Sequence, residues 1–127
     1  MKIYVAHSGA FDFEKELYEV LERSRLSKDH EFFFPEKSVN KIVNTLNVIK
    51  NDIDLLIAEI SFPATGLGIE LGRAESAEVP IVCVYRKGSK FSSSIRFVTK
   101  NFIEYEGPED LIGKVANFIS SKNTSFS

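Results

Sequence analysis

The stretch that most constrains the fold runs from Asp54 to Arg73, with the sequence DLLIAEISFPATGLGIELGR. Its opening run, 54–60, is short and mainly apolar, and two of its side chains are β-branched, which favours a buried strand over a helix. A loop is expected directly after it, because turn-forming residues follow at Pro63, Gly66 and Gly68. We expect a helix from about Ile69 through Glu78. In a parallel α/β sheet, ligands bind beyond the carboxyl ends of the strands, where this loop would lie.

Short apolar runs alternate with segments of helical periodicity along the rest of the chain. Further strands are predicted at 2–6, 31–35, 80–85 and 101–105. Further helices are predicted from Asp12 to about Leu26, from Ser38 to Asp52, and from Pro108 to Ile119. The alternation predicts an α/β fold with a single-domain, mainly parallel five-stranded sheet flanked by helices, a Rossmann-like or flavodoxin-like three-layer sandwich. We expect the domain to span 1–121 and a flexible C-terminal tail to span 122–127.

Composition narrows the possible partners. The 127 residues are 43% apolar and carry a formal charge of −2, with the two signs interspersed. Such a surface gives no electrostatic reason for non-specific binding to a nucleic-acid polymer or a membrane surface. A single cysteine, Cys83, lies in an apolar run and has no internal partner for a disulfide, which favours a reduced, cytoplasmic setting. No run of 18 apolar residues is present.

Several familiar chemistries do not fit the spacing of the residues. Gly66, Gly68 and Gly72 give G-x-G-x-x-x-G, one residue off the dinucleotide fingerprint, and they follow the third predicted strand instead of the first. The chain contains no G-x-x-x-x-G-K-[ST] phosphate loop. Two distant histidines and one cysteine give no zinc-binding constellation. We therefore expect neither a cofactor nor a metal.

Glu70 is the candidate catalytic residue that remains. In a helix that opens at Ile69, Glu70 falls in the first turn, where free N–H groups and the helix dipole favour negative charge. Such a carboxylate would stay ionised and could act as a nucleophile or base; alternatively, it is an ordinary helix-start acid worth less than ~1 kcal/mol. Tyr4 on the first strand and Ser8 just past its end face the same region. His7 is expected to line the pocket mouth or to be solvated, and Ser8 with His7 makes a poor nucleophile and base because adjacent extended residues point apart.

The residues 54–59, Pro63 and 66–74 (GLGIELGRA) resemble the nucleoside 2-deoxyribosyltransferase superfamily, in particular its 2′-deoxynucleoside 5′-phosphate N-hydrolase branch. The similarity extends to 3–8 (IYVAHS), 80–86 and 92–96 (SSSIR), and so covers most of the chain. The core G-x-G-x-E-L-G-[RY]-A is its specific part. In that family, the core glutamate attacks the anomeric carbon of the deoxyribose, releases the base and leaves a glycosyl–enzyme ester. Water then completes hydrolysis, or a second base completes transfer.

The resemblance implies a role for individual positions of this chain. Glu70 would be the nucleophile, and Tyr4 would orient it through a hydrogen bond. Ser8 and Ser92 would contact the sugar 5′ group or its phosphate. Ser92 would reach the site of a neighbouring subunit, which implies a homodimer. The other candidate substrate-binding residues are His7, Ala64, Thr65, Gly66 and Gly68.

The chain departs from the family pattern around the leaving group and the 5′ phosphate. The family's second-helix acid is missing, since the matching region, 44–47, reads NTLN. The serine or aspartate six residues before the nucleophile is Ala64, although Ser61 and Thr65 are near enough to compensate. The basic residue after the first-loop serine aligns with Ala10, and the usual glycine before that serine is His7. A phosphate-binding or acid role for His7 is therefore one hypothesis.

Three further charged residues are interpreted separately. Asp54 begins its strand at the end away from the site and is expected to be a structural cap or a surface acid. Glu59 lies near the carboxyl end of the same strand and either lines the pocket or faces Arg73 or solvent. Arg73 follows Glu70 at i+3, and we expect a structural ion pair between them.

The sequence thus predicts an enzyme that cleaves or transfers the N-glycosidic bond of a 2′-deoxynucleoside or its 5′-monophosphate through Glu70. Two alternatives stay open. One is a hydrolase of a different N-ribosyl compound, since the altered base pocket need not recognise a standard nucleobase. The other is a non-catalytic nucleotide-binding sensor on the same scaffold, which the missing second-helix acid favours.

Overall fold

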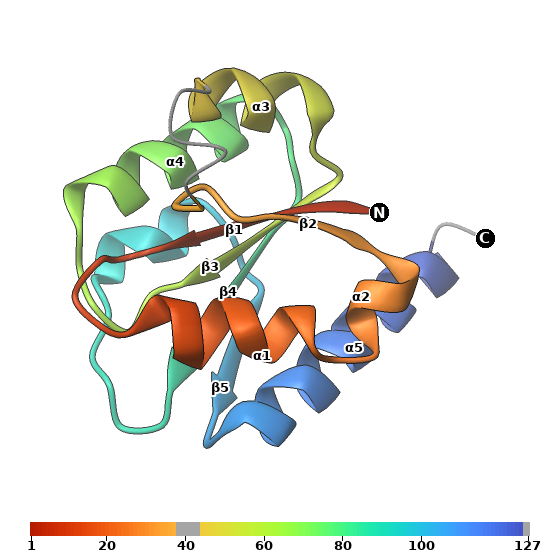
Figure 1. Ribbon diagram of the computed structural model, residues 1–127. Helices are drawn as coiled ribbons and strands as arrows, with labels where there is room; N and C mark the ends of the chain where they lie inside the picture. The colour runs from red at the N-terminus through yellow and green to blue at the C-terminus, as the bar shows by residue number, and fades with distance from the viewer. Residues whose placement is uncertain (38–43, 126–127) are drawn as a thin grey trace.

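Five strands form one sheet in the order β2-β1-β3-β4-β5, and every neighbouring pair is parallel. The computed structural model (Figure 1) describes residues 1–37 and 44–125. The strands are β1 (Lys2–His7), β2 (Glu31–Phe33), β3 (Leu55–Glu59), β4 (Ile81–Arg86) and β5 (Phe102–Tyr105). The predicted α/β fold is confirmed. The strand order reverses between β1 and β3, the position where open sheets of this kind bind ligands.

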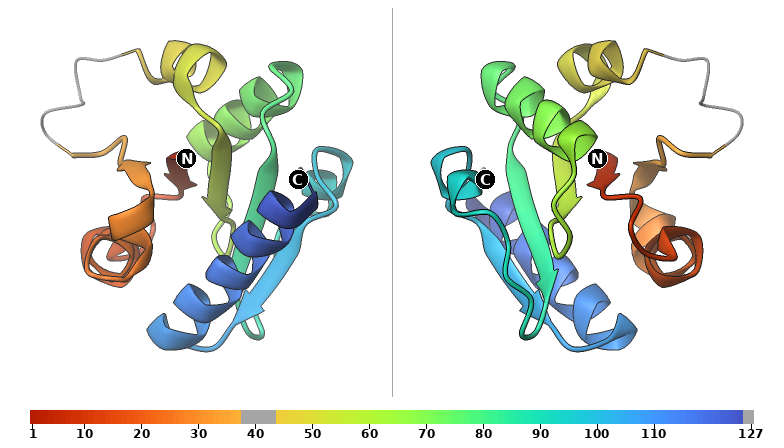
Figure 2. Two further views of the ribbon diagram at one scale, coloured as in Figure 1. Left: turned by 90° about the vertical axis from the view of Figure 1, so that its right-hand side faces the viewer. Right: turned by 90° about the vertical axis from the view of Figure 1, so that its left-hand side faces the viewer.

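Helices cover both faces of the sheet and give three layers, as Figures 1 and 2 show. On one face lie α3 (Thr45–Asp52) and α4 (Thr65–Ser76); on the other lie α1 (Glu19–Glu22), α2 (Leu26–Asp29) and α5 (Pro108–Ser125). Because strand side chains alternate between faces, each face buries its own apolar cluster. Leu56 and Leu71 belong to the cluster under α3 and α4, and Ile57 and Val115 to the cluster under α1 and α5.

The first helical segment is less regular than the sequence predicts. It begins with a π-helical stretch, η1 (Glu14–Tyr18), continues as α1, and ends at Glu22 instead of Leu26. The Ser24 hydroxyl donates to the Leu21 carbonyl at 2.6 Å and accepts from the Leu26 N–H at 3.2 Å. These local bonds compete with the helix ladder and separate α2 from α1.

The second predicted helix begins later than expected. Asn44 has an extended conformation (φ −73°, ψ 96°), and its side chain accepts hydrogen bonds from the N–H groups of Leu46 and Asn47. Asn44 is therefore the N-cap of α3, and the helix predicted from Ser38 starts at Thr45. Ser38 itself lies outside the described residues.

The helix that carries Glu70 begins one turn earlier than the sequence suggests. Thr65 is the first residue of α4, so Gly66 and Gly68 are helical residues and not loop residues. The helix ends at Ser76 and not at Glu78, which has a positive φ of 59°. Because glycine disfavours helices, the sequence predicted that the helix would begin only after Gly66 and Gly68.

The C-terminal part follows the prediction with two differences. A short 3₁₀ helix, η3 (Ser93–Phe97), lies between the strands predicted at 80–85 and 101–105. α5 begins at Pro108, as expected, because proline suits the first turn of a helix. It continues to Ser125, well past Ile119. The domain boundary at 121 stays a prediction.

Candidate active site

Tyr4 and Glu70 meet on the α3/α4 face of the sheet. The Tyr4 hydroxyl donates a short hydrogen bond to Glu70 Oε2. Tyr4 is fully buried on β1, and its ring stacks on Phe33 of β2 with centroids 5.3 Å apart. The packing fixes the phenol, so the predicted contact between Tyr4 and Glu70 is present in the structure.

The charge state of Glu70 differs from the expectation. Since α4 begins at Thr65, Glu70 lies in the second turn, where the helix dipole no longer favours its negative charge. Burial raises the pKa of Glu70 to about 7; the hydrogen bond from Tyr4 opposes this rise, and the charge of Glu36 adds to it. The prediction that Glu70 stays ionised at a helix start is therefore wrong. Its carboxylate changes charge near neutral pH instead.

Three residues that the sequence analysis missed surround this pair. Thr45, the first residue of α3, makes a side-chain hydrogen bond that lowers the pKa of Tyr4, against a larger rise from burial and from Glu70. Tyr18 and Tyr4 are close enough to interact electrostatically, and the charge of Glu70 contributes to a raised pKa of Tyr18. Glu36 acts on Glu70 through its charge. Thr45 belongs to the region where the family's acid is missing, and this was the one available sequence signal.

The remaining predicted residues on α4 divide between its two flanks. A groove of about 550 Å³ is lined by Ala64, Thr65, Gly68, Gly72 and Ile95, among others, and also by Ser92. Glu70 is not among its lining residues. By helical periodicity, Gly66 shares a flank with Glu70, one turn away, while Gly68 and Gly72 lie on the groove side. The structure thus brings Ser92 together with Ala64, Thr65 and Gly68, but on the other side of α4 from the Tyr4–Glu70 pair.

Ser8 and His7 are both buried, and each makes hydrogen bonds to neighbouring groups. The Ser8 hydroxyl accepts a hydrogen bond from the Ala10 N–H at 3.0 Å. His7 is the last residue of β1 and only 8% exposed, so it is neither a loop residue nor solvated. Because side chains alternate along β1, His7 faces the α1/α5 layer while Tyr4 faces α3 and α4. His7 therefore does not meet Glu70 directly.

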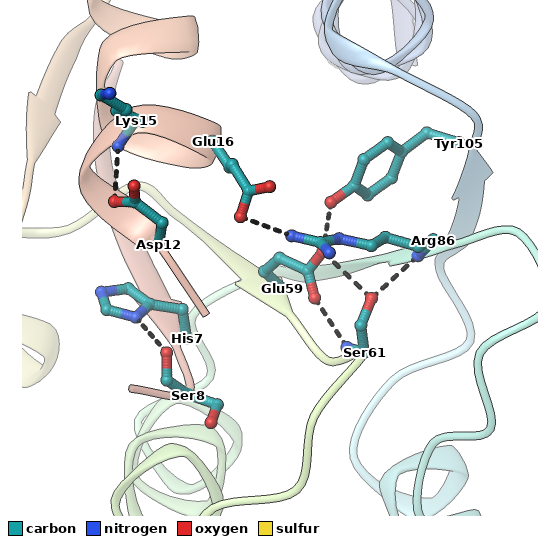
Figure 3. A network of polar contacts seen from close by, with 9 residues as sticks. All are labelled: His7, Ser8, Asp12, Lys15, Glu16, Glu59, Ser61, Arg86 and Tyr105. Atoms are coloured by element: carbon teal, nitrogen blue, oxygen red, sulfur yellow. Dashed lines mark hydrogen bonds and ion pairs between the residues drawn. The ribbon is translucent and has the colours of Figure 1, made fainter. Parts of the chain in front are cut away.

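A second polar network lies on that opposite face (Figure 3). The carboxylate of Glu59 is fully buried and accepts from the Ser61 N–H at 2.6 Å, the Ser61 hydroxyl at 3.1 Å and the Tyr105 hydroxyl. Ser61 Oγ also accepts from the Arg86 N–H at 2.9 Å, and the Arg86 guanidinium pairs with Glu16 at 3.1 Å. Glu59 thus neither lines the candidate pocket nor faces Arg73 or solvent. Through these hydrogen bonds, Glu59 and Ser61 connect the carboxyl ends of β3, β4 and β5.

The other charged residues have mixed outcomes. Asp54 is exposed and accepts a hydrogen bond from the Lys2 N–H at 2.8 Å, which confirms a structural surface role. The predicted ion pair between Arg73 and Glu70 does not form among the described residues. Within 1–37 and 44–125, no cluster of His, Cys, Asp and Glu has the arrangement of a metal site. In the same part of the chain, no helix is long and apolar enough to cross a membrane.

Comparison with known proteins identifies the family of the chain. No model of a known protein family matches the chain. It is 38% identical over 74 residues to 5-hydroxymethyl-dUMP N-hydrolase of Branchiostoma floridae, an alignment that covers 54% of this chain and 70% of that protein. The chain belongs to the 2′-deoxynucleoside 5′-phosphate N-hydrolase family. The family resemblance predicted from the sequence is thereby confirmed.

A second relative of the N-hydrolase family aligns over a longer part of the chain. The Nematostella vectensis protein with the provisional name 2′-deoxynucleoside 5′-phosphate N-hydrolase 1 is 30% identical over 97 residues, which is 72% of this chain and 60% of that protein. Among solved structures, Clostridium botulinum CMP N-glycosidase, BcmB, has a TM-score of 0.64 at 19% identity and covers 91% of this chain and 99% of that one. This likeness supports the three-layer α/β fold independently of sequence.

Proposed function

We propose that this protein cleaves the N-glycosidic bond of a 2′-deoxynucleoside or its 5′-monophosphate, with Glu70 as the nucleophile. The observation that carries the proposal is the hydrogen bond from the buried Tyr4 to the half-buried Glu70 on a chain of the N-hydrolase family. The names of the sequence relatives give deoxynucleoside 5′-phosphates as substrates, 5-hydroxymethyl-dUMP among them, and the name of the structural neighbour gives CMP. Substrate choice within this class is part of the proposal.

The chemistry follows the logic of a retaining glycosidase. An ionised Glu70 oxygen attacks the anomeric carbon through an oxocarbenium-like transition state. The C–N bond breaks, its electron pair leaves with the base, and the base takes up a proton. The product is a glycosyl ester on Glu70, from which water releases the sugar and regenerates the carboxylate. A second base in place of water would give transfer.

Tyr4 has an orienting role in this scheme. Its hydroxyl donates to Glu70 Oε2, and Oε1 accepts no hydrogen bond from the described residues. The bond restricts rotation of the carboxylate and lowers the pKa of Glu70, partly offsetting the effect of burial. Both effects raise the fraction of Glu70 that is ionised and correctly placed at neutral pH.

The proposal includes a cytoplasmic homodimer in which Ser92 serves the partner's site. Ser92 lies in the apolar groove beside α4, on the flank away from Glu70 of its own chain. In the part of the chain that the structure describes, two large apolar side chains are exposed, Phe97 of η3 (89%) and Ile69 of α4 (54%). Exposed apolar side chains beside a groove of this kind are typical of an interface. A second copy packed there would bury them and carry Ser92 toward a neighbouring Glu70.

Chromatographic detection of free base tests the function. The panel consists of deoxynucleosides, their 5′-monophosphates including 5-hydroxymethyl-dUMP, and the ribo equivalents, each with and without an acceptor base. Wild type is compared with Glu70→Ala. We expect base release from at least one 2′-deoxy compound, lost by a factor of at least ~10³ in the variant.

The panel also separates the alternatives. Release only from ribo compounds would identify a hydrolase of a different N-ribosyl compound. Saturable binding of a nucleotide that stays intact over long incubation would identify a sensor. Release that persists unchanged in Glu70→Ala would contradict the assignment of the nucleophile.

A further inference from the structure

A second cavity lies at the carboxyl ends of β4 and β5, on the α1/α5 face of the sheet and so on the opposite face from Glu70. Its volume is about 600 Å³, and it shares no lining residue with the groove beside α4. Three cations line it: Lys15 of η1, Arg86 at the end of β4, and Lys87 directly after it. In parallel α/β sheets, ligands bind beyond the carboxyl ends of the strands. The cleavage proposed for Glu70 makes no use of this cavity.

Arg86 is held in the wall of this cavity from several sides. Its main-chain N–H donates to Ser61 Oγ at 2.9 Å. Its guanidinium lies over the rings of Phe11 and Phe62, 5.0 and 5.3 Å from their centroids. Tyr105 is its partner across the β4–β5 ladder, and the guanidinium donates a hydrogen bond to the Tyr105 hydroxyl. These contacts orient the planar fork of N–H donors before any ligand binds.

The carboxylate of Glu59 supports this arrangement from inside the protein. It is fully buried, and its hydrogen-bond partners among the described residues are Ser61 and Tyr105, the same two residues that bind Arg86. Figure 3 shows how Ser61 and Tyr105 connect Glu59 to Arg86. Burying a carboxylate carries a large desolvation cost, and apolar side chains in its place are often neutral or stabilising. Stability alone therefore does not account for Glu59, whereas a requirement to hold Arg86 in place does.

The acids that line the cavity leave its cations available to a ligand. Glu16 pairs with Arg86 at 3.1 Å, and Glu106 pairs with Lys87 at 2.8 Å. The two carboxylate side chains are 49% and 64% exposed, and ion pairs exposed to this degree contribute little free energy. No ion pair of the described residues includes Lys15. A dianionic group that reaches all three cations would therefore displace both acids.

The lining favours one class of anion. A guanidinium binds a phosphate group through two parallel N–H···O bonds, and ammonium groups beside it add positive charge. A phosphate group fills only part of a cavity of this size. Val20, Pro108 and the ring of Tyr105 line the cavity as well, and they offer apolar contacts to the organic part of a ligand.

We propose that this cavity is a second binding site, which takes a small phosphomonoester such as a sugar phosphate. Arg86 binds the phosphate group, and Lys15 and Lys87 add charge around it. Glu59 is a positioning residue, which acts on Arg86 through Ser61 and Tyr105 and does not touch the ligand. The site goes beyond the proposed function, because no bond is made or broken in it and its occupation does not require Glu70.

The test is a ¹H–¹⁵N NMR titration of the full chain with inorganic phosphate, ribose 5-phosphate and acetate at constant ionic strength. The signals followed are the side-chain Nε–H of Arg86 and the main-chain N–H of Gly107, which also lines the cavity. We expect saturable shifts with both phosphate compounds, and ribose 5-phosphate should bind more tightly than phosphate. Acetate should bind at least ~10-fold more weakly than phosphate, because its charge is smaller.

Substitutions in one ion pair should change the phosphate affinity in opposite directions. Arg86→Gln removes the fork of donors and should weaken binding by at least ~10-fold, read at Gly107. Glu16→Gln removes the competing carboxylate and should tighten binding by about 3-fold. Each substitution has a control with the same change of charge, Lys100→Gln before β5 and Glu31→Gln at the start of β2. Both control residues are exposed and lie at the amino ends of the strands, so the affinity should stay unchanged.

Tyr105→Phe tests the positioning role of Glu59. The variant keeps the ring that lines the cavity but lacks the hydroxyl that joins Glu59 to the guanidinium. We expect the phosphate affinity to fall by about 3-fold or more. The Nε–H of Arg86 should also exchange faster with water in the free protein. A merely structural role of the hydroxyl would lower the free energy of unfolding and leave this exchange rate as in wild type.

Specific outcomes would overturn the inference. No saturable shift with either phosphate compound, or wild-type affinity in a folded Arg86→Gln variant, would remove the site. Acetate binding as tightly as phosphate, or ribose 5-phosphate binding more weakly than phosphate, would exclude a phosphomonoester as the ligand. If Arg86→Gln does not fold, Glu16→Gln decides, and no gain in affinity over Glu31→Gln would remove the site. None of these measurements uses base release, so this inference and the proposed function fail separately.

Discussion

At the residue scale, Glu70 has two properties with opposite effects on its reactivity as a nucleophile. Its carboxylate is held by Tyr4 and partly withdrawn from water, which is useful for attack on a carbon centre. The same setting raises its pKa to about 7, so ionising it costs free energy. A random helix acid would show neither the buried tyrosine partner nor this shift, and perturbed carboxylates are found preferentially at functional sites.

Glu70→Gln should make the folded protein more stable at alkaline pH. A folded-state pKa above the unfolded value means that Glu70 contributes stability in acid, which is lost as pH rises through about 7. Glutamine has no charge to desolvate and can still accept from Tyr4. We expect the variant to exceed wild type in free energy of unfolding by about 1–3 kcal/mol at pH 8.5 and by much less at pH 5, measured by urea denaturation. Equal differences at both values would contradict the raised pKa.

Tyr4→Phe should move the acid limb of the pH–rate profile to higher pH. The lost hydrogen bond lowers the pKa of Glu70 in wild type, so its removal raises that pKa and reduces the ionised fraction at pH 7. We expect kcat/KM at pH 7 to fall by about 10²-fold, with part of the loss recovered at pH 9. An unchanged midpoint would show that Tyr4 does not act on the charge of Glu70.

At the element scale, the helix boundaries decided which predictions succeeded. The strands were predictable because apolar, β-branched runs between turn residues have few alternatives in a short α/β chain. The start of α4 was not, because Gly66 and Gly68 are typical loop residues, yet here they are helical and a Cβ on either would meet nothing within 4 Å. That four-residue displacement moved Glu70 out of the first turn and reversed the expectation for its charge.

Asn44→Ala should weaken α3 and, with it, the site. Asn44 caps an eight-residue helix, because its side chain accepts hydrogen bonds from two main-chain N–H groups. Losing such a cap costs about 0.5–2 kcal/mol. Thr45 beside Tyr4 would lose its fixed position, so kcat/KM should fall as well. Asn47→Ala, an exposed change within the same helix, is the control and should leave the free energy of unfolding within about 0.5 kcal/mol of wild type.

At the scale of the whole molecule, the sequence predicted which edge of the sheet holds the candidate site. It did not predict all the residues that make up the site. The pair Tyr4 and Glu70 was predictable from the family resemblance. The network that joins Glu59 to Arg86 was not, because it connects three strands whose side-chain contacts no local pattern encodes. Within one chain, Ser92 and Glu70 lie on opposite sides of α4, so Ser92 reaches a Glu70 only in the proposed dimer.

A mixing experiment tests the shared site. Glu70→Gln and Ser92→Ala are each expected to be inactive, and a mixed dimer of the two contains one site with both native residues. Random exchange of subunits should then restore about a quarter of wild-type activity. Phe97→Asp, which places a charge in the proposed interface, should shift the protein from dimer to monomer in sedimentation velocity. No recovery from a mixture shown to exchange subunits would place Ser92 outside the partner's site.

The measurement that tests the central claim most directly is mass spectrometry of the enzyme quenched in acid during turnover of a substrate found in the base-release panel. If Glu70 is the nucleophile, the peptide that contains it gains the mass of the deoxyribosyl group, with its phosphate where the substrate carries one. The adduct is absent without substrate and absent in Glu70→Gln. Rapid base release with no adduct on Glu70, and with turnover intact in Glu70→Gln, would contradict the account.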